Sequence, residues 1–215
     1  MKVFKFGGAS VKDAQGVINV KNIISLYKNE ELTVVISAMG KTTNLMEEIL
    51  KFWYSDKTKM MEKFNILESY HYQIASELEN DQHSISTSIE PLFQRLKKII
   101  AEEPSEALDY EYDRIVPFGE YLSTTIVSQY LNLNGFPNKL LDAAKMIRTN
   151  NCFREGQVDW DITQEIILKT FQKYPERLKI TQGFIGGTLE KSTVTLGREG
   201  SDYSAAIIAF SLDAQ

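Results

Sequence analysis

The chain has 215 residues, of which 43% are hydrophobic and 25% charged, and this ordinary globular composition suffices for one substantial hydrophobic core. The formal net charge is -5 and no basic stripe is present, which argues against binding to the phosphate backbone of nucleic acids. The single cysteine excludes an internal disulfide and favours a reducing, cytoplasmic setting, while no apolar run has the length of a membrane span or the position of a signal peptide.

The N-terminal part alternates between the signals of strands and helices. An apolar run predicts a buried strand over residues 3–6, and apolar residues three or four apart predict a helix over 17–27. The β-branched run over 32–37 is typical of a parallel strand covered on both faces. A helix over 42–50 follows, and one of its first two residues, both threonine, can cap it. This alternation predicts an α/β fold with right-handed crossovers.

The middle of the chain has few strand signals. Residues Ser55 to Tyr112 are rich in Lys, Glu, Ser and Asn, and they predict two or three amphipathic helices. Breaks are expected near Asn80–Asp81 and near Glu102–Pro104. We interpret this stretch as a helical insertion in the same domain, at about residues 55–115.

Strand and helix signals return in the second half. We predict strands over 138–143, 178–187 and 192–197, and helices over 119–135, 162–174 and 201–212. The second of these strands enters a glycine turn.

Three turns that contain glycine follow predicted strands, at Gly7–Gly8, at Gly183 with Gly186–Gly187, and at Gly197–Gly200. The carboxyl ends of parallel strands share one edge of a sheet, where ligands bind. Glycine allows close backbone approach, and the N-terminus of a following helix attracts phosphate or carboxylate. A tight connection explains any one of these turns, but three at one edge predict an anion site. None matches the P-loop or the dinucleotide-binding pattern.

Charged residues accompany these turns. Lys5 lies in an otherwise apolar strand, so it must reach solvent at a sheet edge or meet an anion. Arg198 offers a planar fork for a carboxylate or phosphate. Ser201 and Asp202 can cap the following helix, and Asp202 can instead orient a lysine or act through a metal or water. Glu120 either caps its helix or recognises a substrate ammonium.

Hydrolytic chemistry is disfavoured. His71 and His83 both lie in the polar helical insertion, which leaves no geometry for a Ser-His-Asp arrangement. Cys152 lies in a polar loop without a nearby histidine, and we interpret it as incidental. No Cys/His cluster has the spacing of metal ligands, so no metal bound by protein side chains is predicted.

The sequence resembles the aspartate kinases of the amino-acid kinase family in four blocks. "KFGGAS" is similar to the family's K-F-G-G-T-S, and "VVISAMGKTTNLM" to its second-strand serine followed by a T-N-L helix start. "PFGEYLST" resembles its G-E-x-L-S block. "TQGFIGG" with "TVTLGREGSDYSAA" resembles T-Q-G-F-I-G followed by T-L-G-R-G-G-S-D-Y-[ST]-A-A, the most specific block.

This resemblance implies a three-layer αβα fold with a mostly parallel sheet, and ATP-dependent phosphorylation of the side-chain carboxylate of L-aspartate to 4-phospho-L-aspartate. That reaction is the first step of lysine, threonine and methionine biosynthesis. ATP would come with Mg²⁺ held mainly by its phosphates. The implied partners are L-aspartate and ATP, with no nucleic acid or membrane.

The resemblance also implies roles for individual residues. Lys5 and Asp202 would be catalytic, with Lys5 against the transferring phosphate and Asp202 organising the lysine and the reacting groups. Arg198 would bind an aspartate carboxylate and Glu120 its amino group. The remaining implied residues shape the substrate pocket (Thr43, Phe184 and Ser201) or bind the nucleotide together with Lys5 (Phe6, Gly7, Gly8 and Ser37).

Three positions depart from the family pattern. Ala9 replaces the usual threonine, which removes a hydroxyl contact to the nucleotide. Val194 stands between two threonines and, on a strand, faces the opposite way and packs. Glu199 replaces a glycine, which alters backbone freedom and adds a negative charge near the anion site.

Family members continue beyond the last block with the rest of the kinase domain and with regulatory domains. The resemblance thus implies that residues 1–215 are the N-terminal part of a catalytic domain that is incomplete at its C-terminus. We expect little or no turnover from this chain alone, and a homo-oligomer for the full-length protein.

Three alternatives stay open. The first is another amino-acid kinase, such as glutamate 5-kinase or acetylglutamate kinase. The second is a non-catalytic aspartate-binding or regulatory module. The third is a nucleotide-binding α/β domain of unrelated function.

Overall fold

The computed structural model describes residues 1–79 and 84–214, and its centre is a parallel sheet of four strands in the order β1-β2-β4-β3. The strands are β1 (Lys2–Phe6), β2 (Leu32–Ile36), β4 (Leu178–Gln182) and β3 (Asn138–Leu141). All three pairings are parallel, and β2 and β4 are buried along their whole length. The predicted α/β fold with a parallel sheet is therefore confirmed.

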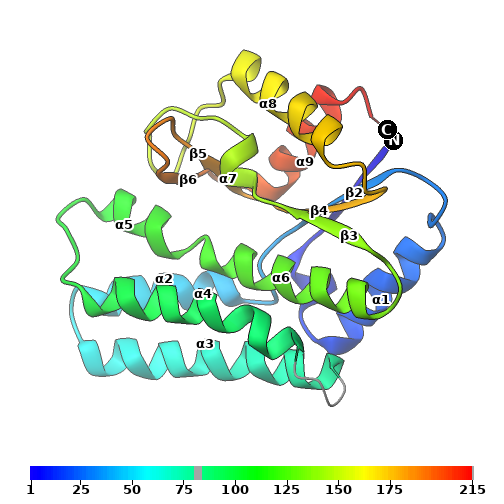
Figure 1. Cartoon of the computed structure of the whole chain (residues 1–215). Coiled ribbons are helices and arrows are strands. Elements are labelled where there is room, and N and C mark those ends of the chain that lie inside the picture. Colours follow the sequence, from blue (N-terminus) through cyan, green and yellow to red (C-terminus); the bar gives the residue numbers. More distant parts are fainter. Residues whose placement is uncertain (80–83, 215) are drawn as a thin grey trace.

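Helices cover both faces of this sheet (Figure 1). The helices α8 (Trp160–Lys173) and α9 (Gly200–Ser211) lie on one face, and α1 (Ala14–Ser25) and α6 (Phe118–Leu133) lie on the other. Successive strand residues point to opposite faces, so Val34 and Val35 are both fully buried but belong to different hydrophobic clusters. The layers are thus helix, sheet and helix.

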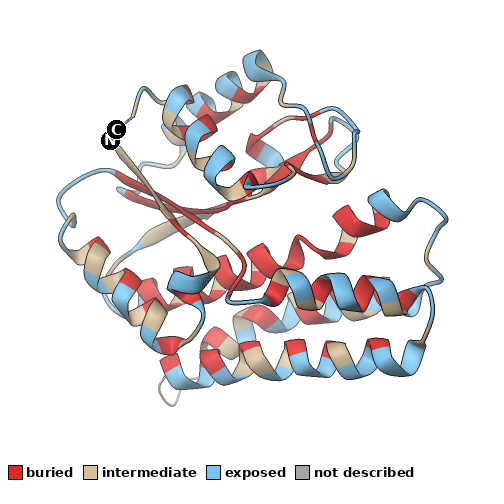
Figure 2. Ribbon diagram, turned by 180° about the vertical axis from the view of Figure 1, so that it is seen from behind, coloured by how far each residue is buried: buried red, intermediate tan, exposed pale blue. Residues whose placement is uncertain are grey.

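Four more helices extend the layer that contains α6: α2 (Thr42–Trp53), α3 (Lys57–Leu78) and α4 (Ser84–Ala101) lie beneath α6 in Figure 1, and α5 (Leu108–Ile115) leads into it. Their buried faces point toward one another and their outer faces are exposed, as Figure 2 shows. The helices predicted between residues 55 and 115 are present, with the expected break after α4. The break expected near Asn80–Asp81, and His83, lie outside the described residues.

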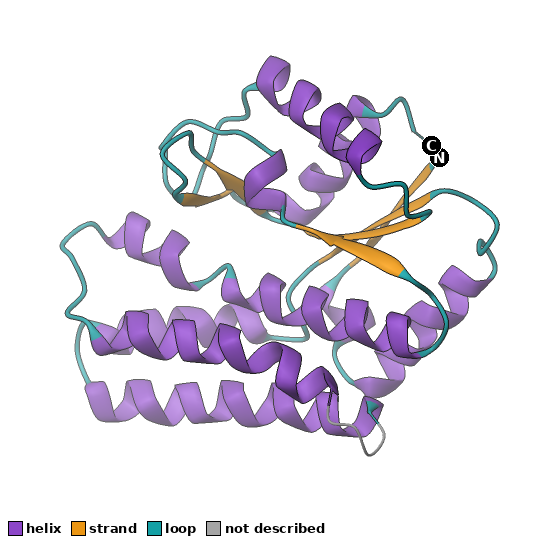
Figure 3. Cartoon of the chain, viewed as in Figure 1, coloured by secondary structure: helices purple, strands orange, loops and turns teal. Residues whose placement is uncertain are grey.

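The stretch 178–187, predicted as a strand that enters a glycine turn, contains two strands that belong to different sheets. After β4 the chain turns at Phe184, whose φ of 69° is incompatible with a continuing strand. It then forms β5 (Ile185–Gly187), which pairs antiparallel with β6 (Thr193–Thr195) as a small hairpin apart from the main sheet (Figure 3). Val194 is fully buried in β6, so it packs as expected.

Two helix starts differ from the prediction. Gly8 opens a short 3-10 turn, η1 (Gly8–Val11), and α1, which was predicted over 17–27, begins earlier, at Ala14, where the side chain of Asp13 caps it. The expected threonine cap of α2 is also wrong, because Lys41 is at the N-cap position without a side-chain bond.

A short helix, α7 (Ala143–Met146), follows β3 and was not predicted. None of the helices within residues 1–79 and 84–214 is long and apolar enough to cross a membrane.

Candidate active site

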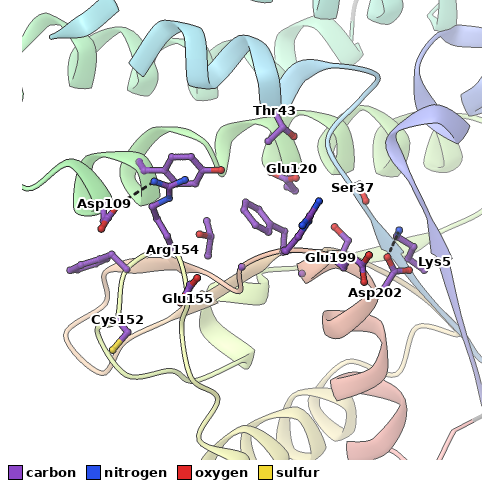
Figure 4. Close-up of a pocket in the computed structure, with 18 residues that line it drawn as sticks. Lys5, Ser37, Thr43, Asp109, Glu120, Cys152, Arg154, Glu155, Glu199 and Asp202 are labelled. Carbon is purple, nitrogen blue, oxygen red and sulfur yellow. Dashed lines mark hydrogen bonds and ion pairs between the residues drawn. The ribbon is translucent and has the colours of Figure 1, made fainter. Parts of the chain in front are cut away.

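A cavity of about 830 Å³ opens at the carboxyl ends of β1 and β2, between the start of α9 and the helices α2, α5 and α6 (Figure 4). It brings together residues that are distant in the sequence. The predicted site residues that line it are Lys5, Ser37, Thr43, Glu120, Phe184, Arg198, Ser201 and Asp202. Phe6, Gly7 and Gly8 are not among its lining residues.

Lys5 meets an anion, one of the two outcomes expected for it. Its Nζ donates a hydrogen bond to Asp202 Oδ2 at 2.9 Å, which joins the end of β1 to the first turn of α9. Asp202 therefore orients a lysine, and it does not cap α9, because the N-cap residue is Glu199. Both side chains retain solvent access, so the pair contributes little stability. Its consequence is positional, since it holds an ammonium group at the cavity wall.

The two glycines after β1 have different surroundings. A Cβ atom at Gly7 would lie 3.6 Å from Lys5 Nζ, so its absence leaves room beside the ammonium. A Cβ atom at Gly8 would lie 2.6 Å from the Ala38 carbonyl oxygen, so Gly8 permits close packing of two loops. The side chain of Phe6 is buried in the hydrophobic core. Any nucleotide contact from Phe6 is thus restricted to its backbone.

Glu120 is a buried carboxyl group with one oxygen unsatisfied. It lies in the first turn of α6 with 3% of its surface exposed, and it is not the cap, because Pro117 is at the N-cap position. The Ala38 N–H donates to Oε1 at 3.2 Å, while Oε2 has no hydrogen-bond partner among the described residues. Burial raises the pKa of Glu120 to about 8. A buried group of this kind at a cavity is suited to a ligand that donates hydrogen bonds.

The start of α9 and the turn after β4 fit closely against each other. A Cβ atom at Gly183 would lie 2.5 Å from Ser201 Cβ, so only glycine allows this approach. The Phe184 N–H donates to Ser204 Oγ at 2.9 Å, which fixes the turn to the helix. Phe184 and Ser201 are thereby placed in the cavity wall.

Arg198 precedes α9 and is exposed. Its guanidinium group forms no hydrogen bond or ion pair with the part of the chain that the structure describes. An unpaired guanidinium group at a cavity is a ready partner for a carboxylate or phosphate.

The cavity has further lining residues that the sequence analysis did not assign to it: Asp109, Tyr112, Cys152, Phe153, Arg154, Glu155 and Thr195. Cys152, interpreted as incidental, is thus exposed at this cavity. Most of these residues come from α5 and from the irregular segment 150–157. Irregular segments lack periodicity, so nothing in the sequence placed them here.

Asp113 connects the segments that form this outer part of the site through hydrogen bonds. It is 1% exposed, and its Oδ2 accepts hydrogen bonds from the N–H groups of Arg154 at 2.8 Å and Thr195 at 3.0 Å. Its Oδ1 accepts from Thr195 Oγ1 at 2.7 Å. Burial raises the pKa of Asp113, although these hydrogen bonds oppose the shift. One carboxylate therefore joins α5, β6 and the segment 150–157.

Comparison with known proteins identifies relatives over the whole chain. The model of the "Amino acid kinase family" matches residues 1–215. Lysine-sensitive aspartokinase 3 of Escherichia coli (strain K12) is 33% identical over 216 residues, which cover 99% of this chain and 46% of that protein. Aspartokinase 1, chloroplastic, of Arabidopsis thaliana is 32% identical over 219 residues, which cover 98% of this chain and 38% of that protein. The chain thus spans less than half of either relative.

Solved structures agree with this result. E. coli aspartokinase III in complex with lysine and aspartate (T-state) matches with a TM-score of 0.90 at 30% identity, and its complex with aspartate and ADP (R-state) with a TM-score of 0.89 at 30% identity. Each match covers 100% of this chain and 47% of the solved chain. The chain belongs to the amino acid kinase family and is aspartokinase-like, as its four sequence blocks predicted.

Proposed function

We propose that the protein transfers the γ-phosphoryl group of ATP to the side-chain carboxylate of L-aspartate, giving 4-phospho-L-aspartate and ADP. The observation that carries this proposal is the unsatisfied, buried Oε2 of Glu120 in one cavity with the unpaired Arg198. Glu120 would bind the substrate ammonium and Arg198 its α-carboxylate. Thr43, Phe184 and Ser201 would shape the pocket around the substrate. The aspartate and ADP named for the E. coli structures support this choice of substrates.

The proposed reaction does not require a strong general base. The side-chain carboxylate of aspartate is ionised at neutral pH, so it can attack the γ-phosphorus directly. A new oxygen–phosphorus bond forms while the bond from that phosphorus to the bridging oxygen breaks, and ADP leaves. Lys5 would neutralise charge on the transferred group, and Asp202 would hold Lys5 in position. The room beside Gly7 fits a phosphate oxygen next to the Lys5 ammonium, and Ser37 would contribute a hydroxyl nearby.

Mg²⁺ fits this site as a companion of the nucleotide. Among the described residues, no group of three or more His, Cys, Asp or Glu side chains is arranged to hold a metal ion. The phosphates of ATP would therefore be its principal ligands. When bound, the ion supplies charge neutralisation between the phosphate groups.

A thermal-shift titration of the 215-residue chain tests the substrate assignment. We expect L-aspartate to raise the melting temperature, because a ligand bound only by the native state adds about 2.7 kcal/mol at a hundredfold excess over Kd. L-Glutamate and D-aspartate are the controls. An equal or larger shift with L-glutamate would favour another amino-acid kinase and contradict the assignment. No shift with any of the three would leave Glu120 and Arg198 without the proposed roles.

The catalytic part needs the complete gene product, including any residues that precede or follow these 215. Acyl phosphates react with hydroxylamine, so we expect ATP- and L-aspartate-dependent formation of a hydroxamate. A clear thermal shift without hydroxamate formation would instead identify a non-catalytic aspartate-binding module.

A further inference from the structure

A second arginine lines the cavity at its outer end. Arg154 lies in the segment 150–157 opposite α5, and Figure 4 shows it beside Asp109, with Glu155 and Cys152 nearby. We propose that Arg154 is a second binding residue for the α-carboxylate of the amino-acid substrate, and that its guanidinium group passes from Asp109 to the substrate when the site fills. This inference rests on the proposed function and deepens it.

The backbone of Arg154 is fixed although its side chain is exposed. Its N–H donates to the buried carboxylate of Asp113 at 2.8 Å, and its φ of 68° lies in the left-handed region. A side chain in this region costs energy, so the surrounding contacts must impose the conformation. Asp113 also holds Thr195 of β6, the strand that leads to Arg198. The same carboxylate therefore connects the segment that carries Arg154 to the strand that precedes Arg198.

The guanidinium group of Arg154 is held weakly. It lies over the ring of Tyr112, with 4.3 Å from Cζ to the ring centroid, and Nη1 is 3.3 Å from Asp109 Oδ1. The Tyr112 hydroxyl donates to Glu47 Oε1 at 3.1 Å, which fixes the ring. The side chains of Arg154 and Asp109 are 45% and 61% exposed, and such ion pairs are weak. Little free energy is therefore lost when the guanidinium group of Arg154 leaves Asp109 and binds a substrate carboxylate instead.

The charges deeper in the cavity support a carboxylate-binding role for this cation. Asp202 already pairs with Lys5 at the phosphate end, and Glu120 is the buried partner for an ammonium group. A carboxylate has about four acceptor positions, and the fork of one guanidinium group fills two of them. The α-carboxylate at Arg198 thus has acceptor capacity left for Arg154, which approaches from the other wall of the same cavity.

The test compares two variants of the complete gene product that change opposite partners of one ion pair. Arg154→Gly removes the guanidinium group without strain, because glycine accepts the positive φ. We expect it to raise KM for L-aspartate about fivefold with little change in kcat. Asp109→Asn frees Arg154, so it should lower KM or leave it unchanged. Arg154→Lys, which keeps a charge without the fork, should fall between wild type and Arg154→Gly.

A matched control is Arg95→Gln. Arg95 is an exposed arginine stacked on Phe118, 5.4 Å from the ring centroid, and it does not line the cavity. We expect its KM to equal that of wild type. An unchanged KM in Arg154→Gly, or equal increases in Arg154→Gly and Asp109→Asn, would overturn the inference, since the latter pattern indicates a merely structural pair.

β-Alanine, which is aspartate without its α-carboxylate, isolates the group recognised. As an inhibitor it should bind Arg154→Gly and wild type equally well. Equal weakening of β-alanine and L-aspartate by Arg154→Gly would overturn the inference. Wild-type protein that neither binds nor phosphorylates L-aspartate would instead overturn the proposed function, and the inference with it.

Discussion

Residue 199 has a backbone conformation that favours glycine, yet it is glutamate. Its φ of 57° and ψ of 20° place Glu199 in the left-handed region directly before α9. We expect Glu199→Gly to raise the free energy of unfolding by up to about 1 kcal/mol, since the relief of strain exceeds the added flexibility of the unfolded chain. The melting temperature should then rise by about 2–4 °C. Glu199→Ala, which removes the charge but keeps Cβ, should give no such gain in thermal unfolding.

We expect Glu120 to make substrate binding dependent on pH. Burial raises its pKa to about 8, so the free protein holds this carboxyl group protonated at neutral pH. An ammonium ligand favours the ionised form, so binding must release a proton below that pKa. We expect the affinity for L-aspartate to increase by up to about tenfold per pH unit as the pH rises toward about 8, and then to level off.

Titration calorimetry at several pH values checks this expectation. Succinate, which is aspartate without its amino group, is the control ligand, and its affinity should lack this increase. Glu120→Gln should abolish the increase for L-aspartate. An L-aspartate affinity that does not change with pH in the wild-type protein would contradict an ammonium partner at Glu120.

At the scale of elements, Asp113 joins α5, β6 and the segment 150–157 through three hydrogen bonds. Asp113→Ala leaves three donors without their acceptor, two N–H groups and one hydroxyl. We expect it to lower the free energy of unfolding by about 2–4 kcal/mol in urea denaturation. Asp113→Asn can still accept from both N–H groups, and its amide can donate to Thr195 Oγ1, so it should lose less. Equal losses in the two variants would show that the hydrogen bonds are not the cause.

The sequence predicted elements where a periodic pattern covers a buried face, and it missed those that depend on local backbone geometry. The helices of the stretch 55–115 and the buried strand at 32–37 have strong patterns and were predicted. The glycine turn after β4 was predicted, but the strand β5 that follows it in a second sheet was not, because the change of direction depends on the positive φ of Phe184, which no apolar pattern reveals. The same holds for Asp113, because its partners lie in distant segments.

At the scale of the whole molecule, topology explains which site residues could be anticipated. Parallel strands place their carboxyl ends at one edge, so a site near the ends of β1 and β2 followed from the predicted sheet. The pairing of Lys5 with Asp202, which are 197 positions apart, requires that α9 pack beside β1, and the pattern of strands and helices does not specify this. The roles of these residues in the reaction stay predictions.

Two buried groups on different helices impose opposite pH dependences on the folded chain. His71 is fully buried in α3, with its Nδ1 at 2.8 Å from the Leu67 carbonyl oxygen, and its Nε2 has no partner within residues 1–79 and 84–214. Burial lowers the pKa of His71 to about 4, so its contribution to stability is present above about 6.5 and is lost as the pH falls toward 4. The raised pKa of Glu120 acts the other way, because its contribution is present below about 4.5 and is lost as the pH rises toward 8.

Between about pH 4.5 and 6.5 the two contributions change in opposite directions, and above about 6.5 only that of Glu120 still changes with pH. We therefore expect the free energy of unfolding, measured with urea, to fall from about pH 6.5 to 8 in wild type and to fall less in Glu120→Gln. In His71→Leu, the free energy of unfolding should instead fall less than in wild type as the pH decreases below about 6.5. The raised pKa of Asp113 acts in the same direction as that of Glu120 and is common to both variants, so it cancels in the comparison. Identical pH profiles for wild type and Glu120→Gln would mean that the buried carboxyl group titrates normally, and the pH dependence of aspartate binding would then have to disappear as well.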